Sequence, residues 1–301
     1  AGSVVTMVDR KLNIEELLDT VVKRKIGALT IVGDAFAKPI LRMLDERPGD
    51  WDLSSLALIT SSGVMWSEPV KQGLLNHHPN MFLIDAFSSS EAIGLGQSIS
   101  AAGAEAKTAK FALGAASRVI TEDGREVTPG SGERGRVAVR GHTPLGYYKD
   151  PEKTAATFIT VDGVRYSMPG DWATVEADGS ITLLGRGSVC INTGGEKVFP
   201  EEVEEVLKLH EAINDAVVVG VPSERFGQTI IAVVEPVAGL DLDGDGLPDL
   251  HAVVAHCHSH LAGYKAPTSV LYVKTIGRAA NGKVDYKRHT TYALETLGLS
   301  E

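Results

Sequence analysis

The fold class of this 301-residue chain is decided by a stretch that begins Ala28-Leu29-Thr30-Ile31-Val32, a short apolar run, and continues with helical spacing over Phe36 to Leu44. A short apolar run predicts a buried strand, and apolar residues three and four apart predict an amphipathic helix. The two patterns alternate along the first part of the chain: helices are expected over Ile14 to Lys25 and Pro69 to Asn76, and strands over Leu56 to Thr60 and Met81 to Asp85. This alternation predicts an α/β fold in which helices cover a mostly parallel sheet.

Polar residues follow two of the expected strands directly. Ser61-Ser62-Gly63 comes after the first of them, and the segment from Asp85 to Glu91 closes the second. Ligands of parallel sheets bind beyond the carboxyl ends of the strands. The sequence therefore predicts a binding site built from these two segments.

The pattern changes twice further along the chain. Residues 110–184 hold short strands separated by turn pairs such as Asp162-Gly163 and Asp178-Gly179, which predicts an antiparallel β subdomain. The rest predicts a small α+β domain, with helices over 201–209 and 250–261 and strands over 215–221, 229–236 and 269–273. We therefore expect a large domain at 1–187, made of an α/β portion (1–109) and a β subdomain (110–187), and a small mobile domain at 188–301.

Composition excludes several classes of protein. The net charge of −10 argues against a nucleic-acid partner, which requires a basic surface. No apolar run reaches the roughly 18 residues of a membrane span, so no integral membrane segment is expected. No signal peptide is visible. The two cysteines, Cys190 and Cys257, give no disulfide framework, and this favours a cytoplasmic location.

One lysine near the C-terminus stands after a tight-turn signal. The segment reads Gly277-Arg278-Ala279-Ala280-Asn281-Gly282-Lys283-Val284-Asp285-Tyr286-Lys287, and an Asn-Gly pair between extended runs predicts a hairpin. Lys283 would then be held at a rigid tip, from which it can deliver one positive charge into a site on another domain. The alternative for the same residue is an ordinary solvated surface lysine.

Together with three upstream segments, this stretch carries a family resemblance. The segments are Asp85 to Glu91, Tyr166-Ser167-Met168-Pro169-Gly170-Asp171-Trp172, and Gly185 to Glu204. In this order the four blocks resemble the signature blocks of the adenylate-forming superfamily, which includes acyl-CoA synthetases, adenylation domains of peptide synthetases, and luciferases. The resemblance runs from about Ile26 to the C-terminus. The phrase Gly194-Gly195-Glu196-Lys197-Val198-Phe199-Pro200-Glu201-Glu202-Val203-Glu204 is most similar to bacterial fatty-acyl-CoA ligases.

The resemblance implies an ATP-dependent ligase that joins a carboxylic acid, a fatty acid or a similar hydrophobic acid, to CoA through an acyl-AMP intermediate, with Mg²⁺ as cofactor. It also implies that the phosphate loop and the segment before it lie outside this chain, which would then be the C-terminal part of a longer enzyme and inactive alone. Two alternatives remain open: an acyl-AMP ligase that loads a carrier protein, and a non-catalytic remnant that binds nucleotide weakly or not at all.

The resemblance also assigns roles to residues. It implies that Lys283 and Glu91 are catalytic, that Glu91 is the Mg²⁺ ligand, and that Ser188 is the hinge. The nucleotide-binding residues it implies are Ser62, Gly63, Asp85, Ala86, Phe87, Ser90, Asp171, Arg186 and Lys283. Those it implies for CoA are Gly194, Gly195 and Lys197.

Each assignment has a local alternative. Glu91 after three serines is also typical of a helix start, Asp171 of a turn or cap, and Arg186 of a surface ion pair. The glycine pair 194–195 is typical of a simple hairpin turn. The chain also departs from the family, which usually has Tyr-Gly-x-Thr-Glu where this chain has Phe87 to Glu91, Asp or Lys at Ser188, and often Lys at Asn192. Phe87 can still stack on adenine, and Ser90 keeps the hydroxyl.

Two further patterns suggest metals only weakly. Asp241 to Gly246 is similar to the start of a calcium loop, but the twelfth position holds Ala252 instead of glutamate. His256 and His260 are four residues apart on an expected helix and can share a metal. A solvated loop and an ordinary helix face are the favoured interpretations.

Overall fold

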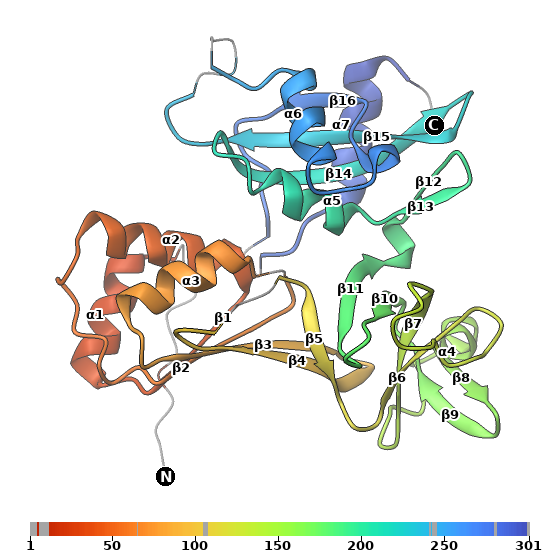
Figure 1. The fold of residues 1–301 in the computed structure, drawn as a ribbon, viewed down its shortest axis with the longest axis horizontal. Helices are drawn as coiled ribbons and strands as arrows, with labels where there is room; N and C mark the ends of the chain where they lie inside the picture. The colour runs from red at the N-terminus through yellow and green to blue at the C-terminus, as the bar shows by residue number, and fades with distance from the viewer. Residues whose placement is uncertain are drawn as a thin grey trace. The chain divides into compact units, whose positions relative to one another are not determined.

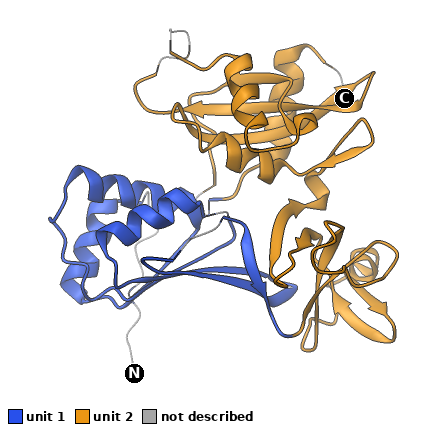
Figure 2. Cartoon of the chain, in the orientation of Figure 1, with its two compact units in different colours: residues 1–115, 280–282 blue, residues 116–279, 283–301 orange. Residues whose placement is uncertain are grey.

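The computed structural model describes Val5 and residues 12–64, 66–104, 108–240, 242, 246–279 and 282–299. The chain divides into two compact units, residues 1–115 with 280–282 (unit 1) and residues 116–279 with 283–301 (unit 2), as Figure 2 shows. This division falls at Ala115, so the β subdomain belongs to the same unit as the C-terminal part. The expected boundary between a large domain (1–187) and a small mobile domain (188–301), with a hinge at Ser188, stays a prediction.

Unit 1 is the α/β portion. Its elements are α1 (Ile14–Arg24), β1 (Ala28–Ile31), α2 (Gly33–Glu46), β2 (Leu58–Ser62), α3 (Glu68–His77), β3 (Phe82–Ser89), β4 (Ala92–Ser100) and β5 (Lys110–Leu113) (Figure 1). Strands β1, β2 and β3 are parallel, whereas β4 and β5 continue the sheet in antiparallel fashion. The predicted order of strands and helices is confirmed from Ile14 onward.

The core of unit 1 joins the helices to the parallel strands. Leu18 of α1, Ile40 of α2 and Leu74 of α3 pack in one cluster with Ile59 of β2 and other apolar strand residues. Helix α1 begins where the sequence predicts, because the side chain of Asn13 accepts a hydrogen bond from the Glu16 N–H at 3.1 Å. Burial of these apolar stripes against the sheet supplies most of the stability of such short helices.

Unit 2 opens with an antiparallel sheet, as expected. Its elements are β6 (Ser117–Ile120), β7 (Arg134–Arg140), α4 (Pro151–Thr157), β8 (Phe158–Val161), β9 (Val164–Ser167), β10 (Asp171–Val175) and β11 (Ile181–Arg186). Strand β7 pairs with β6, β9 and β10, while β8 pairs with β9 and β11 with β10. The turn pairs at 162–163 and 178–179 join β8 to β9 and β10 to β11.

The C-terminal part of unit 2 is built on a second sheet. Its elements are η1 (Gly187–Val189), β12 (Ile191–Thr193), β13 (Glu196–Val198), α5 (Pro200–Leu207), β14 (Ile213–Ser223), β15 (Gly227–Pro236), α6 (Leu250–His258), η2 (Gly263–Lys265), β16 (Ser269–Tyr272) and α7 (Tyr286–Leu297). Strands β14 and β15 form a long antiparallel pair, and β16 lies parallel to β15.

Both faces of this second sheet are covered. Ala216 and Val218 of β14 pack in a cluster that includes residues of α5 and α6. Val217 and Val219, which point to the opposite face, pack with residues of α7. The run of buried residues in β14 follows from this, because a strand covered on both sides has no polar face.

Two features of the C-terminal region differ from the sequence-based expectations. Helix α7 was not anticipated, although Asp285 caps its N-terminus and Gly298, with φ of +66°, ends it. The Asn281-Gly282 hairpin was expected between two extended runs, but no strand lies in the described residues between β16 and α7. Across the turn the Ala279 N–H donates to the Lys283 carbonyl oxygen at 2.9 Å, while Ala280 and Asn281 lie outside the described residues.

Within the part of the chain that the structure describes, no helix is both long enough and apolar enough to cross a membrane. Both cysteines are free thiols, Cys190 partly buried and Cys257 fully buried.

Candidate functional site

The two polar segments of unit 1 lie side by side. Strands β2 and β3 are parallel, and their register pairs Ser61 with Asp85 and Ser62 with Ala86. The structure thus brings together the segments that the sequence places at strand ends. Gly63 follows with φ of +92°, a backbone conformation that favours glycine.

The end of β2 also fixes the start of helix α2. Ser61 is fully buried, and its Oγ accepts a hydrogen bond from the Gly33 N–H at 2.8 Å. Gly33 has φ of +51° and is the first residue of α2, three residues before the start expected from apolar spacing. The long-range bond explains the earlier start, because it satisfies one of the backbone donors that a helix N-terminus leaves open.

Residues 87–91 hold the end of strand β3 and the hairpin turn that follows it. Strand β3 runs to Ser89, Ser90 and Glu91 make the turn, and β4 returns antiparallel. The local alternative of a helix start at Glu91 is therefore wrong. The Phe87 ring lies 5.6 Å from the ring of Phe111, centroid to centroid, and Ser88 Oγ accepts from the Gly94 N–H at 3.1 Å. Glu91 and Ser90 are adjacent on one turn, which is an arrangement of oxygen donors that suits Mg²⁺.

A buried ion pair that joins strand β3 to helix α3 was not predicted from the sequence. Lys71 Nζ lies 3.3 Å from Asp85 Oδ2, and the two side chains are 1% and 5% exposed. Lys71 Nζ also lies 5.7 Å from the centroid of the Trp66 ring. The signal was present in the sequence, because Lys71 shares the apolar face of α3 with Leu74 and Leu75. Asp85, expected to contact nucleotide, is thus held by a lysine inside unit 1.

In unit 2 the β10–β11 hairpin brings two predicted nucleotide-binding residues together. Asp171 and Arg186 are register partners, and Arg186 Nε lies 3.3 Å from Asp171 Oδ1. Asp171 is buried at the start of β10, whereas Arg186 is 57% exposed. An exposed guanidinium beside a buried carboxylate gives the site both an acceptor for hydroxyl groups and a cation for phosphate.

A second carboxyl beside this pair, Glu201, was also missed. Its Oε1 accepts from the Arg186 N–H at 3.2 Å, and within the described residues its Oε2 is buried without a hydrogen-bond partner. Burial, with a smaller contribution from Asp171, raises the pKa of Glu201 to about 7. Gly185 makes this contact possible, because a Cβ at this position would overlap the Glu201 carboxylate.

The residues expected to contact CoA lie on the β12–β13 hairpin. Gly194 and Gly195 form its turn with φ of +58° and +87°, so the local interpretation as a hairpin turn holds for the backbone. Lys197 lies between two groups of the β subdomain: its Nζ is 2.9 Å from Glu122 Oε1 and 4.6 Å from the Trp172 ring centroid. A role for this hairpin in CoA binding stays a prediction.

Ser188 and Lys283 lie on connections. Ser188 is in the short 3₁₀ turn η1 between β11 and β12, where the Cys190 N–H donates to the Gly187 carbonyl oxygen at 3.3 Å. Lys283 lies on the connection between β16 and α7, two residues before the cap of α7. Of the predicted site residues, those from Ser62 to Glu91 thus belong to unit 1, and those from Asp171 to Lys283 belong to unit 2.

The weak metal patterns find no support. Most of the calcium-like stretch, Asp241 and residues 243–245, lies outside the described residues. His256 Nε2 donates to the Val206 carbonyl oxygen at 2.8 Å, and its ring packs against His210 and His260. A search of the described residues finds no group of three or more histidine, cysteine or acidic residues that could hold a metal ion.

Comparisons with known proteins show which enzymes this chain is similar to. Residues 202–283 match the family described as the AMP-binding enzyme C-terminal domain. A medium/long-chain-fatty-acid–CoA/3-oxocholest-4-en-26-oate–CoA ligase of Mycolicibacterium smegmatis is 45% identical over 291 residues, covering 95% of this chain and 52% of the relative. The medium-chain acyl-CoA ligase Mig of Mycobacterium avium is 42% identical over 283 residues, covering 94% and 50%. The chain spans about half the length of the curated relatives it matches.

Solved structures support the fold. An amide bond synthetase from Marinactinospora thermotolerans superposes with a TM-score of 0.74 at 23% identity, over 94% of this chain and 55% of that protein. An anthranilate CoA ligase in complex with anthranoyl-AMP gives a TM-score of 0.72 at 22% identity, over 95% and 52%.

Removal of only one partner of the buried Lys71–Asp85 pair should lower the stability of the chain. Lys71→Met leaves the Asp85 carboxylate buried without its ammonium partner, and we expect the free energy of unfolding to fall by about 3–5 kcal/mol. The double variant Lys71→Met with Asp85→Leu should recover a large part of the loss, because an apolar pair needs no charge compensation. Urea unfolding measures both. Lys23→Met on the exposed end of α1 is the control, and a Lys71→Met chain as stable as that control would contradict the assignment.

The raised pKa of Glu201 predicts a pH-dependent stability. The folded chain holds a proton on Glu201 up to about pH 7, whereas the unfolded chain releases it near the ordinary value of 4.5. The stabilisation from this proton is complete below 4.5 and is lost as pH rises through 7. Relative to Glu201→Gln, the wild-type chain should therefore lose up to roughly 3 kcal/mol between pH 4.5 and 8.

Urea unfolding of both chains at several pH values measures this difference. Glu204 is present in both chains, and burial, with a smaller contribution from the Glu201 charge, raises its pKa to about 8. The comparison therefore removes only the part of the Glu204 titration that does not depend on Glu201. Glu224→Gln, on the exposed turn between β14 and β15, should leave the pH dependence unchanged. Parallel curves for wild type and Glu201→Gln would show that the carboxyl is ionised in the fold.

Proposed function

The chain belongs to the adenylate-forming superfamily, and from this we propose that the protein that contains it is an ATP-dependent acid–CoA ligase. The observation that carries the proposal is the likeness, over 95% of the chain, to a ligase named for fatty-acid and steroid-acid substrates. The four ordered sequence blocks are consistent with it. An acyl-AMP ligase that loads a carrier protein remains the alternative, and dependence on CoA separates the two.

The proposed substrate is a hydrophobic carboxylic acid. The relatives are named for medium- and long-chain fatty acids and for 3-oxocholest-4-en-26-oate, which share an apolar body and a single carboxylate. A cytoplasmic location belongs to the same proposal, because ATP and CoA are the co-substrates.

The first half-reaction joins the acid to AMP. A carboxylate oxygen attacks the α-phosphorus of ATP, the bond from that phosphorus to the bridging oxygen breaks, and pyrophosphate leaves. The ammonium of Lys283 offsets the negative charge at the α-phosphate, while Asp171 accepts hydrogen bonds from the ribose hydroxyls and Arg186 supplies a cation beside it. Transfer of this kind depends on positioning and charge neutralisation.

The proposal includes a Mg²⁺ ion, which the Ser90–Glu91 turn would hold. A carboxylate and a hydroxyl on one turn fit the preference of Mg²⁺ for hard oxygen ligands. When bound there, the ion would offset phosphate charge.

The second half-reaction forms the thioester. The sulfur of CoA attacks the acyl carbonyl carbon, the bond from that carbon to the AMP oxygen breaks, and the thiol proton passes to solvent. We assign the Gly194-Gly195 turn and Lys197 to the approach of CoA. Ser188 is the hinge of the proposal, since it lies in the short connection between the β subdomain and the C-terminal sheet.

Lys283→Ala separates the two half-reactions. In the complete protein we expect the rate of acyl-adenylate formation, followed by ATP–pyrophosphate exchange, to fall about 10²–10³-fold, because one charge aimed at the reacting phosphate is lost. Thioester formation from supplied acyl-AMP should be largely kept.

Lys287→Ala, which removes an exposed lysine on the first turn of α7, is the matched control. Equal losses in both half-reactions would make Lys283 a structural residue, and no loss in either would contradict its catalytic role. A wild-type protein without ATP–pyrophosphate exchange would favour the non-catalytic alternative.

A further inference from the structure

Lys283 lies on a connection that has little regular structure of its own. Between Tyr272, the end of β16, and Tyr286, the start of α7, the described residues form neither a helix nor a strand. A segment of this kind fixes a side chain only if the residues at its two ends are fixed by the surrounding structure. We call residues 276–278 the first stem of the connection and residues 285–286 the second. The contacts of the stems therefore decide how well the Lys283 ammonium is placed.

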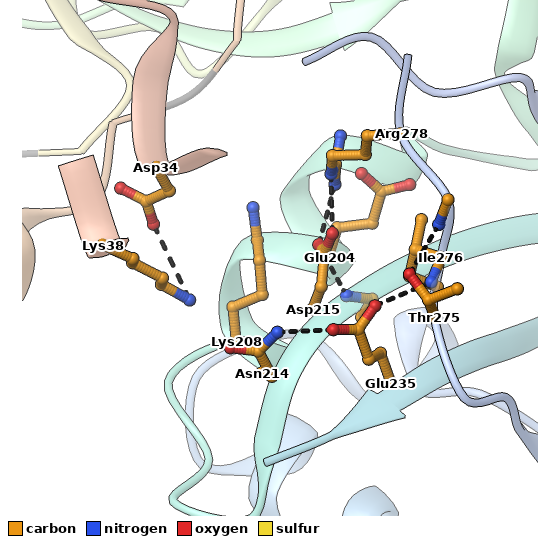
Figure 3. A network of polar contacts seen from close by, with 12 residues as sticks. Asp34, Lys38, Glu204, Lys208, Asn214, Asp215, Glu235, Thr275, Ile276 and Arg278 are labelled. Carbon is orange, nitrogen blue, oxygen red and sulfur yellow. Dashed lines mark hydrogen bonds and ion pairs between the residues drawn. The ribbon is translucent and has the colours of Figure 1, made fainter. Parts of the chain in front are cut away.

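The first stem is held by a bidentate ion pair. Arg278 Nε lies 2.6 Å from Asp215 Oδ2, and Arg278 donates a second hydrogen bond, from its terminal nitrogen to Asp215 Oδ1 at 2.8 Å (Figure 3). The two side chains are 16% and 17% exposed. Burial by itself would raise the pKa of Asp215, but the Arg278 hydrogen bonds and charge outweigh it and the pKa is lowered. The pair is thus ionised and geometrically fixed.

The backbone of the same stem is held two residues earlier. The Ile276 N–H donates to Glu235 Oε2 at 2.7 Å, and Asn214 Nδ2 donates to the other oxygen of that carboxylate at 2.6 Å (Figure 3). The Ile276 carbonyl oxygen accepts from His289 Nε2 at 3.1 Å and from Arg288. The Ile276 side chain is fully buried in the cluster under α7.

The second stem is held by a buried carboxyl of α5. Tyr286 OH donates to Glu204 Oε2 at 3.2 Å, and Glu204 Oε1 accepts from the Val218 N–H at 3.0 Å. Asp285 caps α7 by accepting from the Arg288 N–H at 3.1 Å. Both stems of the connection are therefore tied to β14 or to residues that β14 supports.

We propose that Arg278 and Asp215 are positioning residues for Lys283, a role that rests on the function proposed above. The ion pair clamps the connection to the start of β14 five residues before the lysine, while Glu235 and Glu204 hold the backbone and the far stem. A charge that is preorganised in this way stabilises a transition state without reorganisation during the reaction. Displacement of a catalytic group by about 1 Å can cost roughly 10²-fold in rate.

Arg278→Gln tests the proposal with two independent readouts. In the chain itself, we expect amide hydrogen exchange at residues 276–279 and 282–285 to rise at least about tenfold, because the stem loses its clamp. In the complete protein, we expect kcat for acyl-adenylate formation to fall about 10–10²-fold. The rate of thioester formation from supplied acyl-AMP should change less than about threefold, because that half-reaction does not depend on where the lysine points.

Two further variants separate positioning from stability. Lys265→Gln breaks the Lys265–Glu202 pair, whose side chains are 17% and 13% exposed, in the same half of unit 2 but away from the connection. It removes an ion pair of similar burial and should leave exchange at residues 276–279 and 282–285 as in wild type. The double variant Arg278→Met with Asp215→Leu should regain stability, because apolar pairs replace buried ion pairs without loss, yet remain slow in adenylation.

The results with these variants decide whether Arg278 and Asp215 position Lys283 or only stabilise the fold. Unchanged exchange in Arg278→Gln would overturn the proposal, as would equal losses in both half-reactions, or recovery of adenylation together with stability in the double variant. A wild-type protein without ATP–pyrophosphate exchange would contradict the proposed function instead. Hydrogen exchange would still decide whether the ion pair holds the connection.

Discussion

A carboxyl group removed from water needs hydrogen-bond partners, whether it is ionised or protonated, and this requirement organises both units of the chain. Asp85 pairs with the ammonium of Lys71, and Asp215 pairs with the guanidinium of Arg278. Glu201 accepts a hydrogen bond from the Arg186 N–H, and Glu204 accepts one from the Val218 N–H. Every one of these bonds joins segments at least 14 residues apart in the sequence. The segments that carry the candidate site are thereby attached to the sheets that support them.

Much of the fold follows from local patterns. Strand and helix order in residues 14–85 could be predicted because apolar spacing differs between the two kinds of element, and the antiparallel sheet of residues 117–186 because turn pairs mark its corners. Helix α7 was missed because the Asn281-Gly282 pair was taken as the centre of a strand-flanked hairpin, although Asp285 and Gly298 are ordinary helix caps. The start of α2 was placed late because it depends on Ser61, a residue 28 positions away.

The candidate site could be predicted in its segments but not in its contacts. The ordered blocks pointed to the segments around Glu91, Asp171, Arg186 and Lys283, whereas the hairpin at Glu91 and the pairing of Asp171 with Arg186 are known only from the structure. Lys71 and Glu201 were not found, because a charged residue within a helix is normally solvated. For Lys71 the apolar face that it shares with Leu74 and Leu75 was a local signal, whereas the burial of Glu201 is evident only from its distant partners. The glycine turn at 194–195 shows the opposite case, since its backbone conformation was evident from two adjacent residues.

Gly185 has a consequence for how this chain can vary. Its missing side chain is what leaves room for the Glu201 carboxylate, so any residue with a Cβ at 185 requires a smaller or displaced residue at 201. The two positions lie on different elements, the end of β11 and the first turn of α5, yet they share one small volume. The backbone at 185, with φ of +139°, also disfavours any residue that has a Cβ, so a shorter residue at 201 does not by itself admit a larger one at 185. Glycine is therefore expected to persist at this strand end among homologous sequences, even where the residue on the helix changes.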